Sequence, residues 1–160
     1  MAGEEGAASS RGLWMAIMDI DHFKRVNDQF GHLIGDEVLL MFAQCMRDFF
    51  TEGEELFRFG GEEFVVILDL ESQCSVNRRL ESFRRHIESH VFPQIEHITV
   101  SIGVCYMEAH TYLPTILDRA DRALYYAKEN GRNQVRNYDV LLKRGEIVEA
   151  SNDDNDVELF

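Results

Sequence analysis

Apolar residues along the chain form short continuous runs that alternate with stretches of helical period. The run LWMAIMDI, residues 13–20, is nearly all apolar and ends among acidic residues, which indicates a buried strand. From Phe23 to Phe30 the apolar side chains recur at helical spacing until Gly31 interrupts the pattern. We therefore expect a short helix after the first strand, with Asp21 placed to cap its start.

The remainder of the chain repeats this alternation. The further elements that we expect are an amphipathic helix at 36–50, strands in ELFRF and EEFVVILDL, a helix at about 75–91, a strand at 97–107 and a helix ending in NGRN. Gly60 and Gly61 join the two short strands, which predicts a hairpin. The order β-α-α-β-β-α-β-α, without an internal repeat, indicates one α+β domain with helices covering an antiparallel-containing sheet.

Composition narrows the kinds of ligand that this domain can bind. The 160 residues carry 16 basic and 29 acidic side chains, a net charge of −13. Such a surface argues against binding to nucleic-acid polymers or anionic membranes. Apolar runs are interrupted within about ten residues, so we expect no membrane insertion, because a spanning helix needs roughly 20. An anionic ligand would have to be neutralised by metal ions and a few local bases.

The two ends of the chain differ from its centre in composition. Residues 1–12, rich in Gly, Ala, Ser and Glu, are expected to be a flexible leader or a non-native remnant. We assign the folded domain to residues 13–140. Residues 141–160 end in a segment with six acids and no base, Glu146–Phe160. We expect a disordered, solvated tail there, with binding of a partner as the alternative.

Cysteine and histidine usage does not predict a zinc site. Three cysteines, Cys45, Cys74 and Cys105, are scattered without CxxC spacing, which favours a reducing, cytoplasmic setting and three inert core residues. His86 and His90 have the i, i+4 spacing that places two rings on one helix face. No third ligand stands near them in the sequence, so the pair is not expected to bind a metal.

Acidic and basic residues gather at two junctions of the predicted elements. Asp19 and Asp21 lie where the first strand gives way to a helix, and Lys24 follows one turn later. Glu62 and Glu63 lie at the predicted hairpin, which can fall beside the end of the first strand. A helix start favours phosphate, and carboxylate oxygens favour Mg²⁺. Taken singly, Asp21 could be only a helix cap, and the glutamates only a polar turn.

Four segments in combination resemble one known family. DIDHFKRVNDQFGHLIGDEVL, RFGGEEF, SIGV and ADRALYYAKENGRN are similar, in order and spacing, to the GGDEF domain, the catalytic domain of diguanylate cyclases. The resemblance runs from about Leu13 to Tyr138. It implies an α+β fold like that of nucleotidyl cyclases and polymerase palms, with a five-stranded, mostly antiparallel sheet flanked by helices. It also implies that two GTP molecules are condensed into cyclic di-GMP and pyrophosphate.

The resemblance implies a metal site with two Mg²⁺ or Mn²⁺ ions. Asp19 and Glu62 would be metal ligands together with the carbonyl of Ile20. Glu63 would support the second metal or help to activate the attacking hydroxyl. The third letter of the GGDEF signature is Glu here, which reaches about one carbon further than Asp but is the same kind of hard ligand.

The resemblance also assigns the residues that would hold the nucleotide. The backbone of His22, Phe23 and Lys24, with the Lys24 side chain, would cradle the β- and γ-phosphates. Lys128 and Arg132, four residues apart, would form a second phosphate clamp.

Guanine recognition would fall to Asn27 and Asp36. A carboxylate can accept from the N1–H and the exocyclic amine of guanine, which adenine does not present together, so we expect GTP rather than ATP. Each domain would hold one GTP, so the active species would be a homodimer, whose assembly can be transient. An upstream sensor or regulatory domain is expected in the longer protein, and the location is expected to be cytoplasmic.

Two features depart from the family pattern. Relatives usually open with a helix and a DxLTGLxNR segment, which is not visible here, so the chain is expected to be truncated or atypical at its N-terminus. Many relatives carry an inhibitory Arg-x-x-Asp site for product, and Thr51 and Glu54 stand at those positions. Thr51 lacks the guanidinium, so we expect no inhibitory site. The alternatives are a silent module that binds GTP or cyclic di-GMP, and a structural domain.

Overall fold

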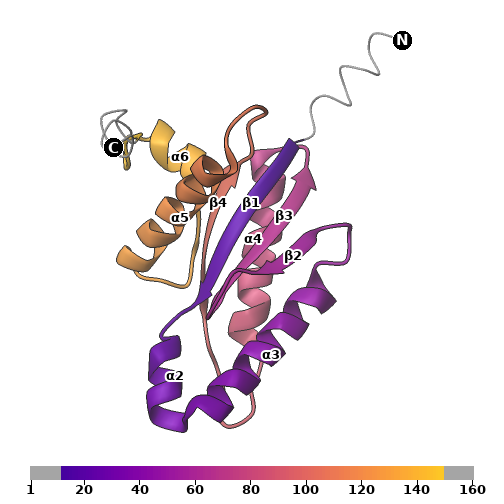
Figure 1. The fold of residues 1–160 in the computed structure, drawn as a ribbon, viewed down its shortest axis with the longest axis vertical. Helices are drawn as coiled ribbons and strands as arrows, with labels where there is room; N and C mark the ends of the chain where they lie inside the picture. The colour runs from indigo at the N-terminus through magenta and orange to yellow at the C-terminus, as the bar shows by residue number, and fades with distance from the viewer. Residues whose placement is uncertain (1–11, 150–160) are drawn as a thin grey trace, which may run out of the picture.

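A five-stranded sheet forms the centre of the protein. The computed structural model describes residues 12–149, and its strands lie in the order β2-β3-β1-β4-β5 (Figure 1). The strands are β1 (Gly12–Ile20), β2 (Glu55–Arg58), β3 (Glu63–Leu70), β4 (Val100–Tyr106) and β5 (Val135–Asn137). The central strand β1 pairs antiparallel with β3 and β4, and β5 joins β4 in parallel. The expected mostly antiparallel, five-stranded sheet is confirmed.

Helices cover both faces of this sheet. They are α2 (Phe23–Phe30), α3 (His32–Phe49), α4 (Gln73–Ser89), α5 (Leu113–Glu129) and α6 (Tyr138–Lys143). Side chains alternate along a strand, so Ala16 and Met18 face the core formed with α3 and α4. Met15 and Ile17 face the core under α5 and α6. In Figure 1, α4 lies behind the sheet, with α5 and α6 to its left.

Helix α5 packs closely on β4 at Gly103, the glycine of SIGV. A Cβ added there would lie 2.2 Å from the backbone nitrogen of Leu124 and 2.3 Å from the carbonyl of Ala120. Only glycine permits this approach without displacing the helix. The approach fixes α5 on β4, with the basic end of the helix towards the end of β1.

The Gly-Gly hairpin prediction is confirmed. Gly60 and Gly61 have φ of 108° and 49°, a conformation that favours glycine. The Arg58 side chain donates through Nε and Nη2 to the Gly61 carbonyl, at 3.2 and 3.0 Å. Strand β3 then places Glu63 directly opposite Asp19 of β1. The hairpin therefore brings its glutamates to the end of the first strand.

Some boundaries differ from the sequence-based expectation. The pattern missed β5 and α6, which are too short to show a period of their own. Leu141 of α6 is buried, so the folded part continues beyond residue 140, where the tail was expected to begin. The rest of that tail, from residue 150, and the leader up to residue 11 lie outside the described residues. Cys74 is exposed, whereas the sequence predicted that it lies in the core. No helix within residues 12–149 is long and apolar enough to cross a membrane.

Candidate active site

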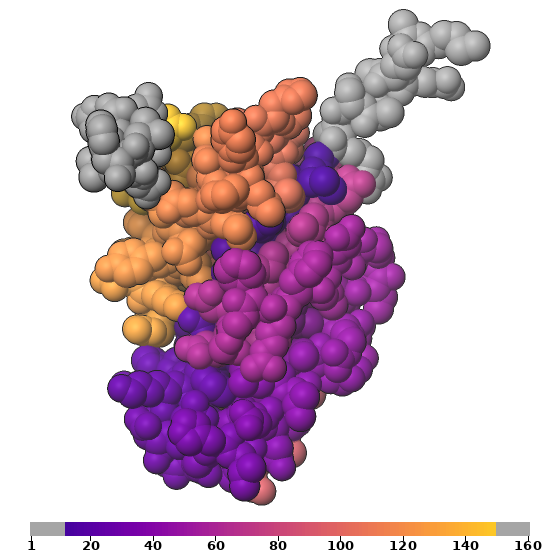
Figure 2. Space-filling view, in the orientation of Figure 1, coloured from indigo at the N-terminus to yellow at the C-terminus, as the bar shows by residue number. Residues whose placement is uncertain are grey.

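A cavity of about 320 Å³ opens at the end of β1. In Figure 2 the orange atoms of α5, the magenta atoms of the β2–β3 hairpin and the indigo atoms of α2 meet around this region. The cavity is lined by Asp19, Ile20, Asp21, His22, Phe23, Lys24, Arg25, Glu62, Lys128 and Arg132. Three segments far apart in the sequence thus bring three carboxylates and four Lys and Arg side chains to one hollow.

Asp19 is a buried carboxylate with one oxygen unsatisfied. Its Oδ2 accepts a hydrogen bond from the Lys128 ammonium, whereas its buried Oδ1 has no partner among the described residues. Burial, with a smaller contribution from the charges of Glu62 and Glu63, raises the pKa of Asp19 to about 6 against the opposing effect of Lys128. Around Asp19 itself, the carboxylates of Asp19, Glu62 and Glu63 outnumber Lys128, the one base that bonds to Asp19.

The donor set around Asp19 fits a hard divalent cation. Leaving a buried oxygen unpaired costs about 1–3 kcal/mol, which a bound cation would offset. Ile20 and Glu62 line the same cavity. Glu63 is half-buried and leaves the same face of the sheet as Asp19, because the two residues are directly paired. Carboxylate and carbonyl oxygens of this kind are the ligands that Mg²⁺ and Mn²⁺ prefer.

Asp21 has a different role from the predicted helix cap. The N-cap of α2 is His22, at φ 57°, and within residues 12–149 no side-chain hydrogen bond caps this helix. Asp21 is instead buried, and its Oδ1 accepts from the Ser101 hydroxyl at 2.6 Å. Its Oδ2 accepts from the Thr99 hydroxyl at 2.7 Å and from the Asn133 backbone N–H at 2.9 Å. Asp21 thus fastens the start of α2 to β4 and to the loop after α5.

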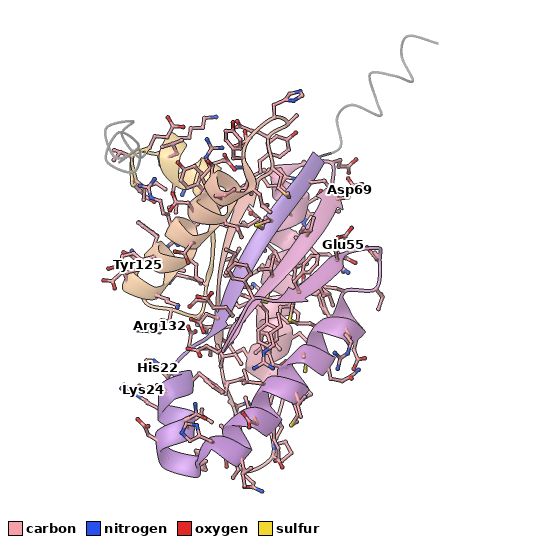
Figure 3. The ribbon with its side chains drawn as sticks, in the orientation of Figure 1. His22, Lys24, Glu55, Asp69, Tyr125 and Arg132 are labelled. Carbon is pink, nitrogen blue, oxygen red and sulfur yellow. The ribbon has the colours of Figure 1, made fainter. Side chains whose placement is uncertain are left out.

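Positive charge reaches the cavity from two sides. His22 and Lys24 lie at the start of α2, and Arg132 follows α5 on the same side of the molecule (Figure 3). The first N–H groups of a helix have no partner within it, so the backbone at Phe23 and Lys24 is suited to an anion. Lys128 completes the set. The residues expected to bind phosphate therefore share one cavity.

Asn27 on α2 and Asp36 on α3 are not among the residues that line this cavity. A Cβ at Gly35 would lie 1.9 Å from the Asn27 side-chain oxygen, so Asn27 packs directly on the backbone next to Asp36. Asp36 itself is exposed. Gly35 is a supporting residue that the sequence analysis missed. Gly35 stood just before the helix expected at 36–50, but α3 begins at His32, so the glycine lies inside the helix.

Thr51 and Glu54, at the expected inhibitory positions, are not among the residues that line this cavity, and they differ in exposure. Thr51 is exposed. The Glu54 side chain is buried and accepts from Arg79 Nε at 2.8 Å. Arg79 also donates to the Phe49 carbonyl at 3.1 Å. Glu54 is therefore part of an internal ion pair.

Sequence comparison finds a family and several characterised relatives. Residues 4–134 match the family described as diguanylate cyclase, GGDEF domain. The chain is 41% identical over 126 residues to the diguanylate cyclase DgcP of Pseudomonas aeruginosa. The aligned segment is 77% of this chain and 19% of the relative. The chain is 35% identical over 130 residues to DgcZ of Escherichia coli, covering 79% and 44%. The chain thus spans less than half the length of these relatives.

Solved structures share the fold. The GGDEF domain of DgcB from Caulobacter crescentus, in complex with c-di-GMP, aligns with a TM-score of 0.76 and 32% identity over 86% of this chain and 84% of that one. The active GGEEF domain of a diguanylate cyclase from Vibrio cholerae aligns with a TM-score of 0.73 and 35% identity, over 86% and 89%. These likenesses confirm the α+β fold expected from the sequence.

Proposed function

Since the chain belongs to the GGDEF domain family of diguanylate cyclases, we propose that it condenses two GTP molecules into cyclic di-GMP with release of pyrophosphate. One observation carries the proposal. The cavity at the end of β1 combines Asp19, whose Oδ1 is buried without a partner in the described part of the chain, with Glu62 and with bases from α2 and α5. A triphosphate with its metal ions supplies the complementary charges.

In this proposal Asp19, Glu62 and the Ile20 carbonyl hold the metal, and Glu63 supports a second ion or the attacking hydroxyl. Two Mg²⁺ or Mn²⁺ ions, when bound, would neutralise the triphosphate and favour in-line attack at the α-phosphate. Glutamate as the third letter of the signature is compatible with turnover, because the Vibrio cholerae relative is described as an active GGEEF domain.

The basic residues bind and orient the triphosphate. The backbone at His22, Phe23 and Lys24 and the Lys24 ammonium hold the β- and γ-phosphates. Lys128 presently bonds to Asp19, and it becomes free to contact phosphate once another cation balances that carboxylate. Arg132, which follows α5, adds a planar donor to the same cavity. Neutralisation of this kind is necessary because the chain as a whole is acidic.

Asn27 and Asp36 select guanine. Gly35 allows the Asn27 amide to lie against the α3 backbone, next to the exposed carboxylate of Asp36. Asp36 can then accept from the N1–H and the amine of guanine. We expect GTP to be consumed and ATP to be left unchanged under the same conditions.

The reaction requires two chains. One cavity holds one GTP, and the 3′-hydroxyl of that GTP must reach the α-phosphate of a GTP held by a facing chain. The active species is then a homodimer that forms at least transiently, brought together in the longer protein by a sensor or regulatory domain. Because GTP is a cytoplasmic nucleotide, we place the domain in the cytoplasm.

Product inhibition at a separate Arg-x-x-Asp site is not expected. Thr51 offers no guanidinium, and the Glu54 carboxylate is engaged by Arg79. Added cyclic di-GMP should therefore inhibit only by competing with GTP at the active site. Inhibition that excess GTP does not relieve would contradict this part of the proposal.

The test is direct. The full chain is incubated with GTP and Mg²⁺ over a wide range of protein concentrations, and cyclic di-GMP is quantified by chromatography. The specific activity should rise with protein concentration, because dimers form. Glu62→Ala should abolish product, whereas Glu55→Ala, at an exposed position on β2 labelled in Figure 3, should not.

Two outcomes would overturn parts of the proposal. If no product forms at the highest concentration while GTP or cyclic di-GMP still binds by calorimetry, the silent binding module is correct. If Glu62→Ala retains full turnover, the metal assignment is wrong.

A further inference from the structure

A second cluster of metal-ligand side chains lies between α3 and α4. Cys45 comes from α3, and His86 and His90 come from α4. One ligand atom from each side chain can be chosen so that all three lie within 4.8 Å of one another. The sequence showed the two histidines without a third ligand, and the fold supplies it. The active-site cavity, by contrast, is lined from β1, α2, the hairpin and α5.

Packing holds this cluster in place. Cys45 is buried, and it lies in the core that joins α3 to α4. His86 and His90 lie one turn apart on one face of α4, with ring centroids 5.9 Å apart. The His86 ring packs against Phe49 at 5.8 Å, and the His90 ring against Phe92 at 4.8 Å. Both rings are therefore partly ordered before any ligand arrives.

We propose that this cluster binds one Zn²⁺ ion through Cys45 Sγ and one ring nitrogen each of His86 and His90, with water as the fourth ligand. Zn–S bonds of about 2.3 Å and Zn–N bonds of about 2.0–2.1 Å place tetrahedral ligand atoms roughly 3.3–3.6 Å apart. Small side-chain rotations close the remaining gap. His86 is exposed and His90 is half-buried, so both rings have room to turn.

The chemistry of the ligands distinguishes this site from the carboxylate site. A thiolate with two imidazoles is typical of Zn²⁺, whereas Mg²⁺ and Mn²⁺ prefer oxygen. As the S–Zn bond forms, the Cys45 thiol releases its proton to solvent, so the site gains one net positive charge. The ion would fasten α3 to α4 across an interface that apolar side chains and the hydrogen bond from Arg79 to the Phe49 carbonyl already hold. Zinc should therefore stabilise the folded state by mass action.

Zinc titration tests the proposal without any nucleotide. The full chain, reduced with a phosphine and stripped of metal, is titrated with Zn²⁺ against a chromophoric chelator. We expect one tight site per chain and a rise in Tm with Zn²⁺. His86→Ala and His90→Ala, at positions with solvent access, should each weaken binding by more than about 100-fold and remove the Tm shift. His97→Ala and Cys74→Ser, at exposed positions, are the matched controls and should bind normally.

Cobalt reports the thiolate ligand. Co²⁺ in a tetrahedral site with one thiolate gives visible bands and a near-ultraviolet sulfur charge-transfer band, which Cys45→Ser should remove. Asp19→Asn should leave Zn²⁺ binding unchanged, which separates this site from the active site. The proposal would be overturned if His86→Ala bound Zn²⁺ as tightly as the unsubstituted chain, or if Asp19→Asn lost Zn²⁺ binding. It would also be overturned if the unsubstituted chain with Co²⁺ showed no charge-transfer band. None of these results depends on cyclase activity.

Discussion

Two buried acid–base pairs lie in different parts of the molecule and are satisfied to different degrees. Asp19 with Lys128 lies at the end of β1, and Glu54 with Arg79 joins the loop after α3 to the interior of α4. The acids are almost equally buried, with side-chain exposures of 8% and 7%. Burial alone therefore does not distinguish the two pairs. Their hydrogen bonds do.

The Glu54 pair is complete. One Glu54 oxygen accepts from Arg79, and the other accepts from the Glu52 backbone N–H at 2.7 Å. Arg79 also donates to the Phe49 carbonyl, and its guanidinium lies 4.9 Å from the centre of the Phe49 ring. Asp19, in contrast, keeps a buried oxygen without a partner among residues 12–149. A complete pair stabilises the fold, whereas an incomplete one is ready for a ligand.

The largest expected effect comes from neutralising the incomplete pair. Asp19→Asn keeps the shape of the side chain but removes the charge that would hold a cation. Cyclic di-GMP formation should fall by about 10³-fold or more, because metal-assisted phosphoryl transfer is lost. The free energy of unfolding in urea should not fall at neutral pH. Asp118→Asn, an exposed position on α5, should leave both quantities unchanged. An Asn variant that is both inactive and unfolded would contradict this view of Asp19.

Breaking the complete pair should lower the stability of the fold and leave turnover nearly unchanged. Arg79→Met leaves Glu54 buried without its base, so the free energy of unfolding should fall by about 2–4 kcal/mol. Turnover measured well below the new Tm should stay within about twofold. Arg85→Met is the matched control, since Arg85 lies on the same helix and is 74% exposed. If both variants are equally stable in urea, the Glu54 pair is not structural.

The pH dependence of stability separates the pairs further. The pKa of Asp19 is raised from 3.8 to about 6, so between these values the folded chain holds a proton that the unfolded chain has released. The free energy of unfolding should therefore fall as pH rises from about 4 to 6 and then level off. Relative to Asp19→Asn, which does not titrate, the loss should be about 1–2 kcal/mol. Parallel urea profiles for the two proteins across this range would refute the shift.

The sequence predicted the elements that position Asp19 and Glu62, but it did not predict every element of the fold. Local patterns predicted β1, the hairpin and α5, because apolar period and glycine position are local properties. They therefore placed Asp19 and Glu62 at the ends of neighbouring strands. Strand β5 and helix α6 were missed because three and six residues carry no period. Their positions depend on packing against β4 and α5.

Long-range partners were the other limit. Asp21 was expected to cap a helix, but its partners Thr99, Ser101 and Asn133 are 78 to 112 residues away in the chain. The pairing of Glu54 with Arg79 and the approach of Cys45 to the α4 histidines are similar cases. In each case the residue types were visible, but only the fold brings them together.

The smallest expected effect tests a third buried acid, Asp21, which resembles Glu54 in its bonding but lies in the active-site cavity. Ser101 is fully buried and donates to Asp21 at 2.6 Å, so Ser101→Ala removes one of three bonds. The free energy of unfolding should fall by about 1 kcal/mol. Because Asp21 also holds the Asn133 backbone, next to Arg132, KM for GTP should rise about two- to threefold with kcat nearly unchanged.

Ser82→Ala, exposed on α4, is the control. An unchanged KM with the same loss of stability would make Asp21 a structural acid like Glu54, whereas the KM shift would show that a complete hydrogen-bond set can also position a binding loop.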